Sequence, residues 1–117
     1  MDPRRQSDPL SDPLRFLEAW YEAHCIKELP DGGGVSIEAV DGPGWWMKID
    51  LRGTPLEGCT IKPTVVAESR ERWQQSWADG TFFTVATSAL DLYDGFVEFR
   101  RFVQCYDETF WDQLLTG

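Results

Sequence analysis

Residues 35–51 read VSIEAVDGPGWWMKIDL and decide the fold. Apolar and polar side chains alternate on both sides of the central DGPG, a pattern typical of two half-buried β-strands at 35–40 and 45–51. The connection at 41–44 contains two glycines and a proline, which favour a tight turn. The segment therefore predicts a β-hairpin.

Three more strands are expected after this hairpin, at 61–68, 72–78 and 81–87. The dipeptide Asp79-Gly80 between the last two strands is a strong hairpin-turn signal. Together with the first hairpin, these patterns predict an antiparallel, meander-like sheet of about five strands.

Helices are expected before and after this run of strands in the sequence. Apolar residues recur at helical spacing over 13–26. Ser88 and Asp91 have the spacing of a capping box at the start of a second helix, which Gly95 interrupts, and a last helical piece is expected at about 107–115. The order helix, strands, helices predicts an α+β fold, with helices on one face of the sheet and water on the other.

The length and composition fit one folded domain. The chain has 117 residues, of which 42% are hydrophobic and 26% charged, and this composition indicates a protein that folds around a core. We expect residues 1–11, which are polar and proline-rich, to form a flexible arm before a single domain at 12–117. Leu56, in a loop at 52–60, is expected to plug one end of the core.

Neither a membrane span nor a secretion signal is visible in the sequence. No apolar run reaches the roughly 18–20 residues that a membrane-spanning helix needs. The N-terminus lacks the apolar segment of a signal peptide. We therefore expect a cytoplasmic protein without a membrane partner.

The acidic charge limits the classes of ligand. There are 20 acidic residues against 11 Lys and Arg, which gives a formal net charge of −9. Direct binding of nucleic acid is disfavoured, because phosphate contacts need clustered Lys and Arg. The charge favours a basic partner, or it serves solubility alone.

The reactive residue types do not form a catalytic or metal-binding motif. Cys25, Cys59 and Cys105 are widely spaced, and the single histidine, His24, is merely next to Cys25 in the sequence. We therefore expect no catalytic residue, no metal and no cofactor. An enzyme would require carboxylates, or Cys25 and His24, gathered in a cleft.

One tryptophan of the first hairpin is difficult to place in the core. If Trp45, Met47 and Ile49 point inward, then Trp46 points to the opposite face, because side chains alternate along a strand. An exposed Trp beside carboxylates is typical of a protein-binding surface. The candidate partner-binding residues are Trp46, Asp50, Glu38, Asp41 and Lys48. Two alternatives stay open: a terminal helix covers Trp46, or the register is reversed and Trp45 is exposed.

Several short motifs of the sequence belong to one recognisable pattern. They are Trp20-Tyr21 followed by Cys25, Ile37, Asp41-Gly42-Pro43-Gly44-Trp45, Ile49-Asp50-Leu51, Thr54 and Leu56, and more weakly Trp73, Asp79-Gly80 and Phe82. In these residues the sequence resembles the bacterial immunity protein 53 family, over about residues 14–103. The chain departs from the family at 26–31, where the family has an acidic, Trp-containing segment that ends in Glu-His. It also has Gly42 where the family commonly has Asn.

The resemblance implies an antitoxin of a polymorphic toxin system. Such a protein is made beside a toxin, often a nuclease, and protects the producing cell by binding it. The partner would be the cognate toxin, and the mechanism would be stoichiometric occlusion without bond chemistry. The chain itself would be a monomer, or a homodimer joined through an exposed edge strand.

A second hypothesis is a small-molecule-binding or accessory protein. In this case Trp45, Trp73, Trp77 and Phe82 would line a pocket between the sheet and the helices. A deep aromatic cavity with a few convergent polar groups would favour this alternative.

Overall fold

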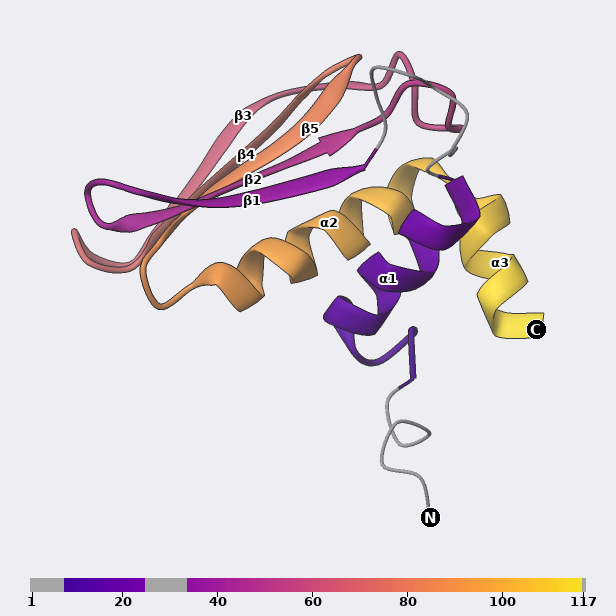
Figure 1. The fold of residues 1–117 in the computed structure, drawn as a ribbon, viewed down its shortest axis with the longest axis horizontal. Coiled ribbons are helices and arrows are strands. Elements are labelled where there is room, and N and C mark those ends of the chain that lie inside the picture. Colours follow the sequence, from indigo (N-terminus) through magenta and orange to yellow (C-terminus); the bar gives the residue numbers. More distant parts are fainter. Residues whose placement is uncertain (1–7, 25–33, 117) are drawn as a thin grey trace.

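The described part of the chain forms a five-stranded antiparallel sheet with helices on one side (Figure 1). The computed structural model describes residues 8–24 and 34–116. The elements, in chain order, are α1 (Pro13–His24), β1 (Val35–Val40), β2 (Gly44–Asp50), β3 (Thr60–Ala67), β4 (Trp73–Asp79), β5 (Phe82–Ser88), α2 (Leu92–Tyr106) and α3 (Glu108–Thr116). The predicted α+β class, the antiparallel sheet and the flanking helices are confirmed. Among the described residues, no helix is long and apolar enough to span a membrane.

The strand order departs from a simple meander at one connection. The order is β1-β2-β5-β4-β3, so the chain passes from β2 inside the sheet to the edge strand β3 and then returns through β4 and β5. The two parts join where β5 pairs with β2, for example with Val85 opposite Met47. Both side chains are buried, and their shared apolar face is a physical reason for this pairing.

The loop from β2 to β3 makes the crossing and closes one end of the core. Leu51 and Leu56 are both 0% exposed, which confirms the expected role of Leu56. The hydroxyl of Thr54 donates a hydrogen bond to the carbonyl of Leu51 at 2.7 Å, and the backbone N–H of Leu56 donates to the Thr54 oxygen at 3.1 Å. These local bonds satisfy polar groups that the loop buries.

Aromatic rings from both layers meet in the core between the sheet and the helices. Phe99 of α2, 0% exposed, lies 5.0 Å from the ring of Trp20 on α1 and 5.6 Å from the ring of Phe83 on β5, centroid to centroid. Phe16 of α1 contacts Phe99 at 6.3 Å. α1 and α2 therefore pack against each other while α2 covers the sheet.

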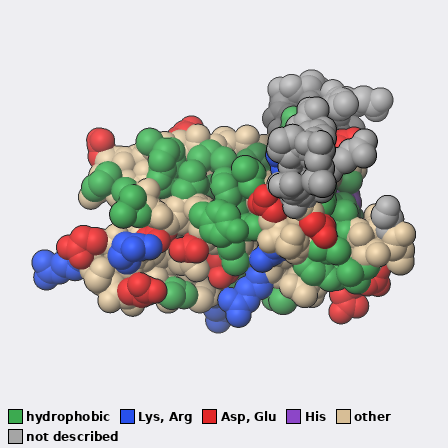
Figure 2. Space-filling view, turned by 90° about the horizontal axis from the view of Figure 1, so that it is seen from below, with side chains coloured by type: hydrophobic (Ala, Val, Ile, Leu, Met, Phe, Trp, Pro, Cys, Tyr) green, Lys and Arg blue, Asp and Glu red, His purple; other side chains and the backbone are tan. Residues whose placement is uncertain are grey.

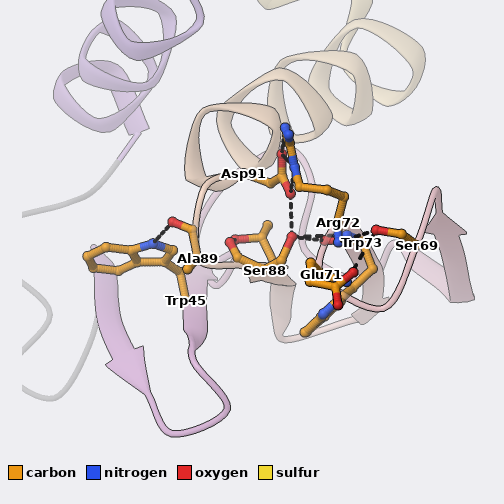
Figure 3. Close-up of polar contacts among 9 residues, drawn as sticks. Trp45, Ser69, Glu71, Arg72, Trp73, Ser88, Ala89 and Asp91 are labelled. Carbon is orange, nitrogen blue, oxygen red and sulfur yellow. Dashed lines mark hydrogen bonds and ion pairs between the residues drawn. The ribbon is translucent and has the colours of Figure 1, made fainter.

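The start of α2 differs from the predicted capping box (Figure 3). Asp91 precedes the helix, but its carboxylate makes no capping hydrogen bond. It accepts hydrogen bonds from the Ser88 hydroxyl and from Arg72, whose Nη2 lies at 2.6 Å and Nε at 2.9 Å. The Ser88 oxygen in turn accepts the backbone N–H of Trp73 at 2.9 Å. The buried carboxylate therefore ties the ends of β4 and β5 to the start of α2.

The expected flexible arm at 1–11 and the first expected helix at 13–26 lie partly outside the described residues. Residues 1–7 of the expected flexible arm, and residues 25 and 26 of the first expected helix, are not described. Residues 8–11 form a turn, and Arg100 of α2 donates a hydrogen bond from Nη1 to the carbonyl of Leu10 at 3.1 Å.

Candidate functional site

The side of the sheet away from the helices carries a band of aromatic side chains, which we call the aromatic face. Its members share one face by strand alternation and by register, because Trp46 lies opposite Ala86, Trp77 opposite Thr84, and Phe82 opposite Asp50. The aromatic face consists of Trp46, Trp73, Trp77 and Phe82. In Figure 1 the described helices α1, α2 and α3 lie on the other side of the sheet. The predicted division into a covered face and an open face is thus confirmed.

Trp46 and Trp77 form the centre of the aromatic face. Their ring centroids are 5.4 Å apart at an interplanar angle of 76°, an edge-to-face contact that spans the intervening strand β5. The β5 residues on this face are small, and Thr84 and Ala86 are only 3% and 7% exposed. Small side chains between the two tryptophans leave space for the indole rings to meet. Trp46 nevertheless stays 38% exposed.

Basic side chains border the aromatic face at Phe82. The Nζ of Lys48 lies 4.1 Å from the ring centroid of Phe82, and the guanidinium carbon of Arg52 lies 5.7 Å from it. Asp79, the last residue of β4, accepts backbone N–H bonds from Phe82 at 2.7 Å and Thr81 at 2.9 Å. These two bonds, with a smaller effect of Lys48, lower the pKa of Asp79 below its ordinary value.

Four of the five predicted partner-binding residues are exposed. Trp46 and Lys48 lie on the open face, and Glu38 lies on β1 directly opposite Trp46. Asp41 is exposed in the turn between β1 and β2. The structure therefore brings Glu38 and Trp46 side by side and places Asp41 at the end of the same hairpin.

Asp50 does not belong to an exposed acidic surface. It is 6% exposed, and its carboxylate accepts hydrogen bonds from Arg52 at 3.0 Å from Nε and 2.6 Å from Nη2. The backbone N–H of Arg52 also donates to it at 2.9 Å. A charge held in this way is neutralised within the chain, so we leave Asp50 out of the binding surface.

The neighbouring Trp45 occupies the helix side of the same strand. It is half-buried, and its indole N–H donates a hydrogen bond to the carbonyl of Ala89 at 2.9 Å (Figure 3). The alternative in which the register is reversed, with Trp45 outward and Trp46 inward, is therefore wrong. The alternative in which a terminal helix covers Trp46 is also wrong.

The aromatic pocket expected for a small-molecule-binding protein does not form as predicted. Trp73, Trp77 and Phe82 lie on the open face, whereas Phe83 takes the inward position and is 2% exposed. The sequence held a signal for this arrangement, because the Asp79-Gly80 turn fixes how β4 pairs with β5. Of two adjacent phenylalanines in a strand, only one can then face the helices.

On the helix side, the described residues line shallow, open grooves. A groove of about 300 Å³ lies between β3, β4 and α2, lined by Ile61, Ser76, Phe83, Phe102 and Tyr106 among others. Figure 2 views the helix side and shows acidic and basic side chains scattered among hydrophobic ones. Within residues 8–24 and 34–116, no group of three His, Cys, Asp or Glu side chains is placed to hold a metal ion.

Among the described residues, the histidine and cysteine side chains considered for nucleophilic chemistry do not gather in a cleft. Cys25 lies outside the described residues, while Cys59 is a half-buried and Cys105 an exposed free thiol. His24 packs against the rings of Trp20 at 5.4 Å and Phe110 at 4.9 Å. Its burial lowers its pKa, an effect that the nearby Asp107 partly opposes.

Comparison with known proteins identifies a family. A family model described as immunity protein 53 matches residues 14–104, which is most of the chain and includes the whole sheet and most of α2. No curated protein and no solved structure matches significantly.

Proposed function

Because this chain belongs to the immunity protein 53 family, we propose that it binds a cognate toxin through the aromatic face and blocks the toxin by stoichiometric occlusion. The family consists of immunity proteins of polymorphic toxin systems. The observation that carries the proposal is the contact between Trp46 and Trp77 on the side of the sheet opposite α1, α2 and α3. We expect the protein to act in the cytoplasm of the producing cell.

The aromatic face has the properties of a binding anchor. Tryptophan is enriched among the few interface residues that supply most of the binding free energy. Trp46 is held by its contact with Trp77, so little conformational freedom would be lost when a partner covers it. A standard interface buries about 800 Å² on each partner, which is about a tenth of the 7590 Å² accessible surface of this chain.

The acidic charge supports a basic partner surface. Glu38 and Asp41 flank Trp46 on the same hairpin, and the whole chain carries a formal net charge of −9. Long-range attraction of this kind accelerates encounter and is weakened by salt, while the buried anchors set the dissociation rate. A nuclease toxin, whose active site must hold phosphate, would present such a basic surface.

Occlusion requires no bond chemistry from this chain. A bound immunity protein excludes the toxin's substrate by volume and by charge, and each molecule inactivates one toxin molecule. The proposal therefore assigns Trp46, Trp77, Glu38, Asp41 and Lys48 to binding and no residue to catalysis.

The proposal is tested with the toxin encoded beside this chain in the producing genome. The toxin's activity is titrated with the full chain, and we expect a sharp end point at one molecule per toxin. Trp46→Ala should raise the dissociation constant at least about thirty-fold, as expected for the loss of a hot-spot tryptophan. Circular dichroism checks that the variant is folded.

Tyr93→Ala is the matched control. Tyr93 is an aromatic residue of α2 and is 58% exposed on the helix side of the molecule. Its removal should change the dissociation constant less than two-fold. A toxin that stays active in an excess of the protein, or a Trp46→Ala variant that binds as well as Tyr93→Ala, would contradict the proposal.

A further inference from the structure

The two edge strands of the sheet differ in how they are protected against pairing with another strand. β3 contains Pro63 and Lys62, and its register with β4 shifts between Ile61 and Thr64. Proline, lysine and irregular register are devices that block strand addition at an edge. β1 has the sequence VSIEAV and pairs with β2 without a register shift, so it has none of these devices.

The backbone groups that β1 leaves unpaired can be identified from one hydrogen bond. The backbone N–H of Asp50 donates to the carbonyl of Gly34 at 3.0 Å, which makes Gly34 a hydrogen-bonded position of the β1–β2 pair. Because such positions alternate along a strand, every second residue from Gly34 faces β2. The residues that direct N–H and C=O away from the sheet are therefore Val35, Ile37 and Ala39.

The side chains of these same residues lie on the helix side and are not fully covered. Ile37 is 40% exposed, Ala39 is exposed and Val35 is half-buried. Figure 2 shows hydrophobic side chains spread from the upper left to the middle of the helix side. The edge thus combines unpaired backbone groups with apolar side chains that a further strand would cover.

We propose that β1 pairs antiparallel with β1 of a second copy of this chain, about a two-fold axis at Ile37. In this register Ile37 lies opposite Ile37, and Val35 of each copy lies opposite Ala39 of the other. All of these are outward-directed positions, so each opposed pair can exchange two backbone hydrogen bonds.

The polar side chains of β1 select this register among those with the same backbone pairing. With the axis at Ile37, Ser36 lies opposite Glu38, where the hydroxyl can donate to the carboxylate. Moving the axis to Glu38 would place two carboxylates opposite each other, which is destabilising. Moving it to Ser36 would place Ala39 opposite position 33, which precedes the first residue of β1. Charge and hydrogen bonding therefore favour the axis at Ile37.

The dimer joins two sheets into one. Because the axis is perpendicular to the sheet, both aromatic faces lie on the same side of the joined sheet, and the helices of both copies lie on the other. The dimer leaves the aromatic faces open, and the inference does not depend on the identity of the toxin. A short edge contact is small for a stable interface, so we expect a dissociation constant in the micromolar range.

Sedimentation equilibrium of the full chain tests the proposal. The wild-type chain should approach twice the 13.4 kDa monomer mass at about hundred-micromolar concentration. Ile37→Lys and Ile37→Glu should each be monomeric, because like charges then meet at the axis. An equimolar mixture of the two variants should form a dimer again, which also shows that both variants are folded.

Val65→Lys is the matched control, since Val65 is 61% exposed on the other edge strand, β3. This variant should dimerise like the wild type. The proposal is overturned if the wild-type chain is monomeric at this concentration, or if its dimer survives both single charges at Ile37. It is equally overturned if Val65→Lys abolishes the dimer, or if the mixed variants stay monomeric.

Discussion

Replacing Gly95 with alanine is expected to stabilise the fold, although this glycine is buried between α2 and the sheet. A Cβ at this position would contact side-chain carbons of Val85 at 3.4 Å, Thr87 at 3.6 Å and Met47 at 3.8 Å. These are ordinary van der Waals distances to side chains, so the new methyl group fits without moving the backbone. In a helix interior alanine is favoured over glycine by about 1 kcal/mol.

The assay is urea unfolding monitored by circular dichroism. Gly95→Ala should raise the unfolding midpoint at an unchanged slope, and should raise Tm by about 3–5 °C for a chain of this length. Gly44→Ala is the opposite case, because its Cβ would lie 2.4 Å from the carbonyl oxygen of Thr87. That backbone atom cannot be avoided by a rotamer change, so we expect a loss of about 2 kcal/mol or more. A Gly95→Ala variant less stable than the wild type would contradict this reasoning, because α2 would then lie too close to the sheet for a Cβ at position 95.

Three other predictions concern stability and association. Leu56→Ala should lower the free energy of unfolding by about 2–5 kcal/mol, measured by urea unfolding, because Leu56 is fully buried; a loss under about 1 kcal/mol would contradict its role. Hydrogen bonds from Arg72 and Ser88 lower the pKa of Asp91 to about 2, so this residue's contribution to stability is full above the unfolded pKa near 4 and is lost as the pH falls toward 2. In Asp91→Asn that part of the acid sensitivity should be absent from pH-dependent unfolding, and an unchanged acid profile would refute the assignment. Glu38→Gln should slow toxin association at low salt and change the dissociation rate little in stopped-flow and surface-binding measurements; the reverse pattern would contradict a steering role.

The strands and their faces were predictable because they depend on local patterns. Alternation along 35–40 and 45–51 places Trp46 outward once Met47 and Ile49 point inward, and the structure agrees within one residue at each strand end. The Asp79-Gly80 turn likewise determines which β4 residues face β5. Side-chain period and turn chemistry act over a few residues, so a sequence shows them directly.

Non-local features were not predictable in the same way. The pairing of β5 with β2 depends on which apolar surfaces fit together after the chain has crossed the sheet, and no short pattern encodes it. Ser88 and Asp91 have the spacing of a capping box, yet Arg72 from the β3–β4 turn takes the carboxylate. Asp50 follows the alternation but is neutralised by Arg52, so an outward position did not make it available to a partner.

Hydroxyl-radical footprinting of the chain with and without its toxin tests the binding surface most directly, because side-chain oxidation reports solvent access residue by residue. We predict that the toxin strongly reduces oxidation of Trp46 and Trp77 while the oxidation of Tyr93 and Tyr106, exposed on α2, stays unchanged. Protection of Tyr93 and Tyr106 with unchanged oxidation of Trp46 would place the toxin on the helices and contradict binding through the aromatic face.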